Sequence, residues 1–321
     1  MPAAISVRQL VKRYGAFEAV RGIDFEVHRG ETFGFLGPNG AGKSTTINIL
    51  CTLALPSAGS ASVCGYDVVT ERQQVRRQLG LVFQDATTDD YLSAEQNLRF
   101  HAEVYGMPKA AVLGRMQQLL EMVGLWERRS SFVGTFSGGM RRRLEIARGL
   151  LHAPRVLFLD EPTIALDPQT RSSVWGYITE LKKREATTIF LTTHYMDEAE
   201  RCDRIAIMDG GRVVALGTPA ALKQQVGKDV VHIRTADNTA AMATLERVFS
   251  LSSTLHDGAF RFDVSDAASF LPHVFSQLGV PIHAVTVSQP SLDDVFMAFT
   301  GRAIRDSDET SRERRPRHFK R

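Results

Sequence analysis

The pattern of apolar and polar positions predicts short strands that alternate with helices. Thr32–Leu36 is an apolar run typical of a strand buried on both faces, and the glycine-rich stretch after it predicts a loop. A helix is predicted over residues 43–53. Earlier in the chain, strand-like stretches at 5–11 and 22–27 are separated by a polar turn at 12–15. Small strands therefore lead directly into a strand–loop–helix unit.

The middle of the chain first becomes helical and then returns to strands. Residues from about 85 to 150 have a mainly helical pattern, in which Ser93 and Gln96 form a capping box. Strand-like runs follow at 156–159, 187–193, 205–208 and 212–216. The first two are apolar through their middles, as expected where both faces of a sheet are covered. Strands interleaved with helices predict an α/β fold with a parallel sheet.

A second, smaller domain is predicted after a short helix that starts at Thr218 and Pro219 and ends before Gly227. The pattern beyond it has the order β-α-β-β-α-β, at residues 229–236, 238–249, 251–256, 259–265, 267–278 and 282–287. This order is that of a small α+β ferredoxin-like module. A last helix near 292–300 precedes a charged tail. The expected domains are 1–220 and 221–301, with 302–321 as a basic, disordered tail.

Charge and cysteine content narrow the class of protein. The formal charge is +3, but residues 302–321 hold eight Lys or Arg against four Asp or Glu, so the preceding residues carry −1. A nearly neutral body argues against nucleic acid as a partner.

Cys51, Cys64 and Cys202 lack metal-ligand spacing and are interpreted as thiols in a reducing compartment. No run approaches the ~18 apolar residues of a membrane helix, so we expect a cytoplasmic protein that reaches a membrane through another chain.

Residues 37–44 match the phosphate-binding P-loop pattern G-x-x-x-x-G-K-[ST] in full. In this pattern the glycines let backbone N–H groups turn toward phosphates, and the next helix N-terminus adds partial positive charge. Lys43 is expected to reach the β- and γ-phosphates and Ser44 to ligate Mg²⁺, while Thr45 can donate on the α-phosphate side. The alternative is a glycine turn before an ordinary helix. The motif residues are Gly37, Pro38, Asn39, Gly40, Ala41, Gly42, Lys43 and Ser44.

An acidic pair follows the apolar strand at 156–159. We expect this strand to lie beside the P-loop strand and to deliver Asp160 at its carboxyl end, where open α/β sheets bind ligands. Asp160 would hold Mg²⁺ through water. Glu161 would orient or deprotonate an attacking water. A strand ending in Asp-Glu is common, but together with an upstream P-loop it indicates nucleotide hydrolysis.

One further motif resembles a known family. Phe136, Ser137, Gly138, Gly139 and Met140 open a helical stretch and resemble the Leu-Ser-Gly-Gly-Gln signature of ATP-binding-cassette (ABC) proteins. A serine and two glycines at a helix N-terminus form another anion site. Phe136 and Met140 differ from the family's leucine and glutamine, but the phosphate-facing Ser-Gly-Gly is intact. The alternative is a capped helix with no special role.

Other landmarks of the family follow in the expected order. The resemblance implies that Tyr14 stacks on adenine, and that Gln84 senses Mg²⁺ and water and opens the loop facing the membrane partner. It also implies that Asp167, two residues after Ala165, belongs to the D-loop that communicates across a dimer. His194, which follows a predicted strand, would contact the γ-phosphate.

The resemblance implies both a fold and a mechanism. The fold is α/β, a P-loop NTPase of the ABC type with a mixed central sheet, an N-terminal antiparallel β subdomain and a helical subdomain, followed by the small C-terminal module. The cofactors would be ATP and Mg²⁺. A homodimer would hold each ATP between one P-loop and Ser137, Gly138, Gly139 and Met140 of the partner, which act in trans. Hydrolysis would drive a separate multi-span membrane permease from the cytoplasmic face of the membrane.

The end of the chain points to a group within the family. Residues 289–302 and 193–199 resemble the daunorubicin/doxorubicin-resistance group of exporter ATPases. This resemblance implies efflux of a drug, an antibiotic or another amphipathic molecule through a separate permease. An exporter of lipid or polysaccharide, an import ATPase and a soluble nucleotide-dependent regulator are the alternatives. A single P-loop and the lack of heptad runs disfavour translation-factor and chromosome-maintenance cassettes.

The C-terminal module and tail have two interpretations each. The module is expected to be regulatory or to stabilise the dimer, and the alternative is inert packing. The basic tail either contacts anionic lipid or is simply solvated.

Overall fold

The computed structural model describes residues 3–85, 87–164, 166–256 and 258–301. The tail at 302–321 and Ala165 lie outside the described residues. The chain divides into two compact units, of which one ends at Thr218 and the other begins at Pro219.

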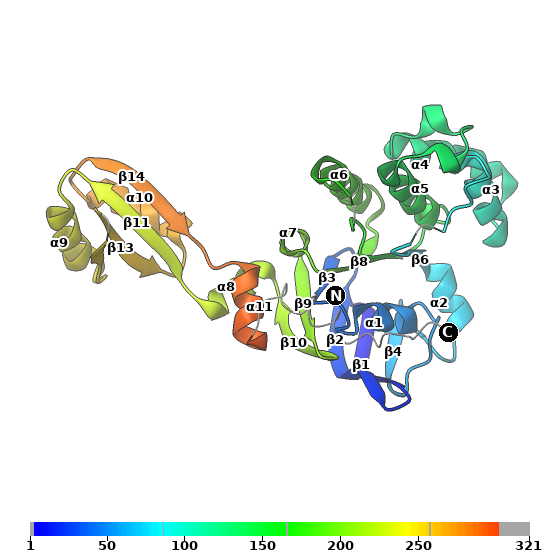
Figure 1. Ribbon diagram of the computed structural model, residues 1–321, viewed down its shortest axis with the longest axis horizontal. Coiled ribbons are helices and arrows are strands. Elements are labelled where there is room, and N and C mark those ends of the chain that lie inside the picture. The colour runs from blue at the N-terminus through cyan, green and yellow to red at the C-terminus, as the bar shows by residue number, and fades with distance from the viewer. Residues whose placement is uncertain (1–2, 86, 165, 257, 302–321) are drawn as a thin grey trace, which may run out of the picture. The chain divides into compact units, whose positions relative to one another are not determined.

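A six-stranded sheet forms the centre of the first unit. Its strands are β3 (Thr32–Leu36), β6 (Leu79–Val82), β7 (Val156–Asp160), β8 (Thr188–Thr193), β9 (Arg204–Asp209) and β10 (Arg212–Gly217). They follow the order β10-β9-β3-β8-β7-β6 (Figure 1). All neighbours are parallel except β10, which is antiparallel to β9. Every residue of β3, β7 and β8 is buried, as expected for strands covered on both faces.

The order of the strands corrects one prediction. Strand β7 does not lie beside β3, because β8 separates them. A crossover connection can pass over a neighbouring strand, and the local sequence does not encode how far it reaches. The register still aligns the carboxyl ends, since Leu36 pairs with Thr193 and Asp160 pairs with Thr192. The residues that follow β3, β7 and β8 therefore meet at one edge of the sheet.

An antiparallel sheet forms the N-terminal subdomain, in the order β2-β1-β4-β5. Its strands are β1 (Ala3–Tyr14), β2 (Phe17–His28), β4 (Ala58–Val63) and β5 (Tyr66–Asp67). The turn predicted at 12–15 starts later than expected, because β1 continues to Tyr14 and the chain reverses at Gly15, whose φ is 58°. Lys12 and Arg13 pair with Val20 and Glu18 of β2. The charges of Lys12 and Arg13 belong to the end of a strand at the surface, where polar residues are as common as in turns.

Phenylalanine rings hold the two sheets of the first unit together. Phe25 of β2 lies 5.7 Å from Phe33 and 5.3 Å from Phe35, measured between ring centroids. Phe190 of β8 lies 5.6 Å from Phe33 and 5.3 Å from Phe158 of β7. These distances are those of favourable aromatic pairs, and all five rings are buried. This core fixes the sheet edge that carries the predicted site.

Helices surround the sheets of the first unit. They are α1 (Lys43–Leu50), α2 (Arg72–Gln78), α3 (Ala94–Val104), α4 (Lys109–Met122), α5 (Gly138–Leu150), α6 (Pro168–Glu185) and α7 (Met196–Ala199), with 3-10 turns at Trp126–Arg128 and Val133–Thr135. The helix predicted over 43–53 ends early, because Thr52 takes the left-handed conformation with φ 62°. The capping box of Ser93 and Gln96 forms at the start of α3, as predicted. In Figure 1, α3, α4 and α5 group together as the helical subdomain.

The second unit is an α+β module. Its elements are α8 (Pro219–Val226), β11 (Asp229–Thr235), α9 (Asn238–Phe249), β12 (Thr254–His256), β13 (Ala259–Val264), α10 (Ala267–Gln277), β14 (Ile282–Ser288) and α11 (Leu292–Thr300). The sheet is antiparallel with the order β12-β13-β11-β14, which is the order of the ferredoxin-like fold. Val231, Ile233 and Phe260 of the sheet pack with Leu245 and Val274 of the helices. The predicted ferredoxin-like fold is confirmed.

Candidate nucleotide-binding site

The loop between β3 and α1 can be built only with glycine at two of its positions. A Cβ atom at Gly37 would lie 2.2 Å from the carbonyl oxygen of Met208, and one at Gly42 would lie 2.5 Å from that of Ala19. Gly42 also has φ 106°, which other residues rarely adopt. The Gly37 N–H donates to the Thr193 carbonyl at 3.2 Å and so ties the loop to the end of β8. The loop is thus fixed at the carboxyl edge of the sheet, directly before the N-terminus of α1.

The remaining loop residues differ in exposure. Pro38 and Ala41 are buried, whereas Asn39 and Gly40 are exposed to solvent. The Gly211 N–H donates to the Ala41 carbonyl at 3.0 Å. The middle of the loop is therefore exposed to solvent, while the residues on either side of it are buried and held by hydrogen bonds.

Lys43 is held inside the loop by three oxygen atoms. Its Nζ donates to the carbonyls of Gly37 at 2.6 Å and Pro38 at 3.1 Å, and lies 3.4 Å from Glu161 Oε1. Only 4% of its surface is exposed. A buried ammonium is tolerated when oxygens surround it, so the structure keeps a positive charge at the centre of the loop.

Ser44 and Asp160 provide adjacent oxygen atoms at the same edge. Ser44 Oγ donates to Asp160 Oδ1 at 3.2 Å, and Asp160 also accepts from Thr192 Oγ1. Hydroxyl and carboxylate oxygens are suitable ligands for Mg²⁺. The described residues contain no cluster of three His, Cys, Asp or Glu with metal-site geometry. A divalent cation held by these two side chains would need further oxygen ligands to complete its coordination.

Glu161 has a strained backbone and two cationic or polar neighbours. Its φ is 46°, which is unusual for a residue other than glycine and typical of functional positions. Its N–H donates to Thr192 Oγ1 at 3.0 Å, and its Oε2 lies 3.3 Å from His194 Nδ1. Burial by itself raises the pKa of Glu161, but the contacts with His194 and Lys43 outweigh it and lower that pKa below its usual value. The carboxylate is therefore ionised at neutral pH.

Three other predicted residues lie near the edges of this arrangement. Tyr14 is half exposed at the end of β1, with Lys12 Nζ 4.8 Å from its ring centroid. Gln84 follows β6 by two residues, and its side chain is exposed. Thr45 is partly buried in the first turn of α1.

The signature residues start helix α5. Ser137 is its N-cap, and Ser137 Oγ accepts from the Met140 N–H at 3.3 Å. Ser137 and Gly138 are exposed, and open space surrounds the position of a Cβ at Gly138. A Cβ at Gly139 would lie 2.4 Å from Thr170 Cγ2 of α6. The first turn of α5 is therefore exposed at Ser137 and Gly138 and lies against α6 at Gly139.

Asp167 begins helix α6 in a similar way. It accepts from the Thr170 N–H at 3.0 Å and from the Thr170 hydroxyl at 2.6 Å. These hydrogen bonds, the hydroxyl first, lower the pKa of Asp167. Its side chain therefore caps the exposed N-terminus of α6.

Two residues of the site were missed from the sequence. Thr192 bonds both Asp160 and the Glu161 N–H, and its pairing with Asp160 would have been visible once the strand register was known. Arg142 is 7% exposed and donates to the carbonyls of Pro162 at 2.6 Å, Asp160 at 3.1 Å and Phe83. Burial lowers the pKa of Arg142 to about 10, which leaves it charged at neutral pH. Nothing in the run Arg141, Arg142 and Arg143 marked the middle arginine as the buried one.

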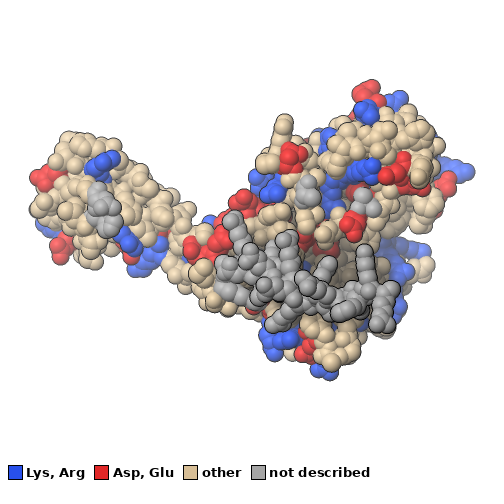
Figure 2. Space-filling view, in the orientation of Figure 1, with Lys and Arg blue, Asp and Glu red and all other residues tan. Residues whose placement is uncertain are grey.

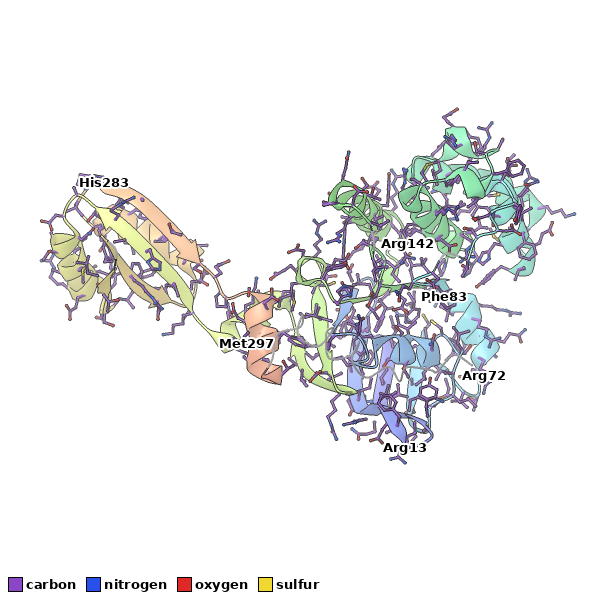
Figure 3. All side chains as sticks on the ribbon, in the orientation of Figure 1. Arg13, Arg72, Phe83, Arg142, His283 and Met297 are labelled. Atoms are coloured by element: carbon purple, nitrogen blue, oxygen red, sulfur yellow. The ribbon has the colours of Figure 1, made fainter. Side chains whose placement is uncertain are left out.

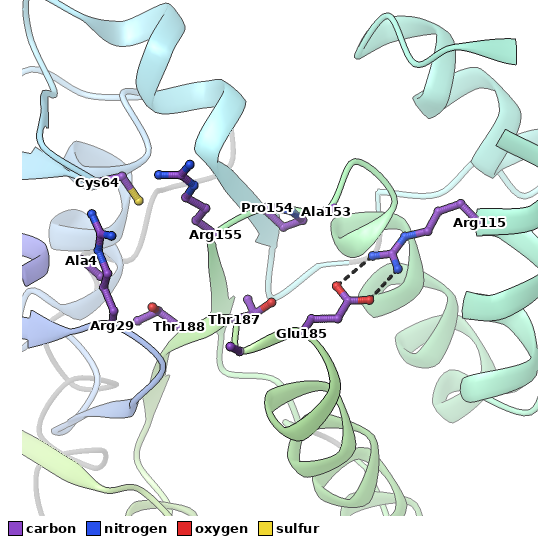
Figure 4. Close-up of a pocket in the computed structure, with 11 residues that line it drawn as sticks. Ala4, Arg29, Cys64, Arg115, Ala153, Pro154, Arg155, Glu185, Thr187 and Thr188 are labelled. Carbon is purple, nitrogen blue, oxygen red and sulfur yellow. Dashed lines mark hydrogen bonds and ion pairs between the residues drawn. The ribbon is translucent and has the colours of Figure 1, made fainter. Parts of the chain in front are cut away.

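A cavity lies at the amino ends of the strands, on the opposite edge of the sheet from the P-loop. It has a volume of about 520 Å³ and is lined by residues that precede β3, β7 and β8, among them Arg29, Arg155 and Thr187 (Figure 4). Arg115 of α4 and Glu185 of α6 form a bidentate ion pair at its rim, at 2.5 and 2.9 Å. These residues lie at the amino ends of the strands, away from the P-loop. This cavity is not part of the nucleotide-binding site.

Figure 2 shows acidic and basic side chains interspersed over the visible face of the helical subdomain. Among the described residues, no helix has the length and apolar character needed to cross a bilayer.

Comparison with known proteins assigns the family. Residues 20–164 match the family described as ABC transporter, and residues 217–300 match the C-terminal domain of ATP-binding proteins like DrrA1-3. The daunorubicin/doxorubicin resistance ATP-binding protein DrrA of Streptomyces peucetius is 40% identical over 94% of each chain. The linearmycin resistance ATP-binding protein LnrL of Bacillus subtilis is 36% identical over 94% of this chain and 100% of its own. Nod factor export ATP-binding protein I of Ralstonia nicotianae is 38% identical over 94% of this chain and 95% of its own.

Solved structures match the first unit. The chain cbiO1 from Clostridium perfringens, part of the ABC transporter complex cbiONQ, has a TM-score of 0.65 and 29% identity, covering 69% of this chain and 91% of that one. A dimeric, post-hydrolysis structure of the cassette MJ0796 bound to ADP and Pi has a TM-score of 0.61 and 25% identity, covering 67% and 98%. The predicted cassette fold and family are therefore confirmed. The chain belongs to the ATP-binding subunits of ABC transporters, as an ATPase of the DrrA-like family.

Proposed function

We propose that the chain energises an ABC exporter as a homodimer at the cytoplasmic face of a membrane, together with a separate multi-span permease. The observation that supports this most directly is the convergence of Lys43, Glu161 and His194 beside the Ser44–Asp160 pair. Two charged groups and a polar imidazole gather here from three segments distant in sequence. Burying charged groups together costs folding free energy, so such a cluster is typical of a functional site.

The ionised Glu161 is the proposed general base. A water in line with the γ-phosphate would donate a hydrogen bond to its carboxylate, which would take the proton as the water oxygen attacks phosphorus. The bond between phosphorus and the β–γ bridging oxygen would break, so that ADP and phosphate are the products. His194, 3.3 Å from Oε2, orients this carboxylate and contacts the γ-phosphate. Lys43 transfers its hydrogen bonds from the loop carbonyls to the β- and γ-phosphates, which stabilises the charge that moves during transfer.

The residues present fit Mg²⁺, and we propose Ser44 and Asp160 as its protein-side partners, with Gln84 approaching from the end of β6. When bound, Mg²⁺ supplies charge neutralisation on the β- and γ-phosphates. The adenine would rest on Tyr14, whose exposed ring is available for stacking.

Two copies would complete each site. The exposed first turn of α5 offers Ser137, Gly138 and Gly139 to the phosphates of a nucleotide held on the partner, and Asp167 lies on the same side at the start of α6. The dimeric relative bound to ADP and Pi supports this arrangement. ATP then holds the two copies together, and the dimer separates after hydrolysis.

The permease is proposed to bind at a groove of about 710 Å³ beside the Gln84 loop. The groove is lined on one side by Phe83 and Thr87, which flank Gln84, and on others by Leu53 and Val104, which are exposed apolar residues. Exposed apolar side chains around a groove are typical of a protein interface.

The cargo is proposed to be a drug, an antibiotic or another amphipathic molecule, because two of the relatives are named for resistance to such compounds. The relative named for Nod factor export keeps an exporter of a different cargo open as the second candidate. The C-terminal module is proposed to regulate or stabilise the dimer.

The test uses the full chain carrying Glu161→Gln, with ATP and Mg²⁺, in detergent extracts of membranes from its own cells. We expect a dimer by light scattering and co-purification of a multi-span membrane protein. ATP-dependent uptake of daunorubicin into inverted vesicles that hold the co-purified membrane protein and the unaltered chain, in place of Glu161→Gln, would support the drug cargo. A variant that stays monomeric with ATP bound and retains no membrane protein would contradict the proposal and favour a soluble regulator.

A further inference from the structure

Helix α5 holds the segment after β6 at both of its ends. This segment, residues 83–90, is called the Gln84 loop below, and all of it but residue 86 is described. Near its start, Arg142 of α5 donates to the Phe83 carbonyl, and Figure 3 shows the two residues close together. At its end, Arg141 donates to Asp90 Oδ1 at 2.7 Å. The loop thus lies along a helix that belongs to the helical subdomain.

Thr87, in the middle of the loop, has all of its polar groups bound by two side chains of α5. Its N–H donates to Glu145 Oε1 at 2.8 Å, and its hydroxyl donates to Glu145 Oε2 at 3.1 Å. Arg148 donates to the Thr87 hydroxyl and, at 3.3 Å, to the Thr87 carbonyl. Arg148 also donates to Glu145 Oε2 at 2.6 Å, which closes the set. We call these three residues the Thr87 network.

Within the Thr87 network the ion pair of α5 is buried, whereas Thr87 itself is exposed. Glu145 is 1% exposed, and the side chain of Arg148 is 13% exposed. A buried carboxylate is stable only when its oxygens are satisfied, and here Thr87 supplies two of the three donors. The Thr87 donors therefore stabilise the buried carboxylate, and the carboxylate in turn holds the middle of the loop in place.

The spacing along α5 connects this network to the signature. Residues 141, 145 and 148 lie one helical turn apart on a single face, and the same helix starts at the Ser137 N-cap. Arg142, next to this face, reaches the carbonyls of Asp160 and Pro162 at the end of β7. A continuous helix of 13 residues therefore links the loop, the signature turn and the catalytic strand end.

We propose that Thr87, Glu145 and Arg148 are positioning residues that attach the Gln84 loop to α5. The loop and the Ser137–Gly138–Gly139 turn then move as one body. A displacement of the loop by the permease is passed to the turn that binds the partner's nucleotide, and closure of the dimer is passed back to the loop. The proposal rests on the proposed function, in which the loop faces the permease and the turn acts in trans.

The test measures amide hydrogen exchange in the full chain carrying Glu161→Gln, with and without ATP·Mg²⁺. Binding of ATP should slow exchange in the first turn of α5 and also in residues 83–90. Thr87→Val removes the hydroxyl at nearly constant volume, whereas Thr87→Ser keeps it. We expect the ATP-dependent slowing in 83–90 to be retained with serine and to fall about tenfold with valine, while the α5 turn stays protected in both.

Two further variants separate positioning from simple stability. Glu145→Gln should have the same effect as Thr87→Val, and the two together should be less than additive. Glu95→Gln is the matched control, because Glu95 forms an exposed ion pair with Arg99 on α3 and should change nothing. A purely structural role would speed exchange in 83–90 equally with and without ATP, and that result would overturn the proposal.

The two levels of the argument fail in different ways. If ATP does not slow exchange in the α5 turn even before Thr87 is changed, the proposed dimer is wrong. If the α5 turn is protected and 83–90 responds to ATP equally in Thr87→Val and Thr87→Ser, the dimer stands and the Thr87 network carries no coupling.

Discussion

The two edges of the six-stranded sheet both hold charged side chains, but in different ways. At the carboxyl edge Lys43 and Glu161 are buried, their partners come from three loops, and the backbone is strained at Glu161. At the amino edge Arg29 and Arg155 are exposed around a cavity of about 520 Å³, and Arg115 forms an ion pair with Glu185 and also donates to the Leu150 carbonyl. The chemistry lies at the carboxyl edge, although the amino edge has a well-formed cavity. Convergence of buried groups, rather than cavity volume, marks the functional edge.

The largest expected effect comes from Glu161→Gln. The amide cannot accept the proton of the attacking water, so ATP hydrolysis should fall by about 10²- to 10⁴-fold while ATP binding is retained. Steady-state phosphate release and nucleotide titration measure the two separately. Hydrolysis at the unaltered rate would mean that the carboxyl edge does not supply the base.

Lys43→Ala should weaken nucleotide binding. Loss of a hydrogen-bonding charge on the phosphates should raise the Kd for ATP about 10- to 100-fold, and hydrolysis should fall with it. Fluorescence titration with a labelled ATP measures the affinity. Arg155→Ala, a loss of charge at the amino edge, is the control and should leave the Kd unchanged.

Glu185→Gln applies the same chemical change as the first variant at the amino edge. The Arg115–Glu185 pair is bidentate and mostly buried, with side-chain exposures of 15% and 19%, so its loss should lower the free energy of unfolding by about 1 to 2 kcal/mol. Hydrolysis by the folded protein should not change. Urea unfolding and phosphate release measure the two effects. A large loss of hydrolysis would show that the amino edge also takes part in the reaction, which contradicts the proposed difference between the two edges.

The same contrast shows what the sequence can predict. The P-loop was predictable because Gly37, Gly42 and Lys43 act within one short segment whose backbone needs are local. The module order and its antiparallel sheet followed from periodicity. Thr192 and the position of β7 were not predictable, because they depend on β8 lying between β3 and β7. Arg142 and the Thr87 network depend on which side of α5 meets the Gln84 loop, and that is a property of packing between distant segments.

The smallest expected effect is a dependence of stability on pH at Glu161. The contacts with His194 and Lys43 hold its pKa below the usual 4.5 despite burial. Ionised Glu161 therefore stabilises the fold above pH 4.5, and this contribution is lost as the pH falls through the lower folded-state pKa. The difference in unfolding free energy between the wild type and Glu161→Gln should be constant near neutral pH and shrink in acid. Urea unfolding at a series of pH values measures it, provided that the m-values of the two proteins agree. The effect is small because burial opposes the two favourable contacts. A difference that grows in acid would show that burial raises the pKa of Glu161 by more than His194 and Lys43 lower it. Those two contacts would then not stabilise the carboxylate at the carboxyl edge.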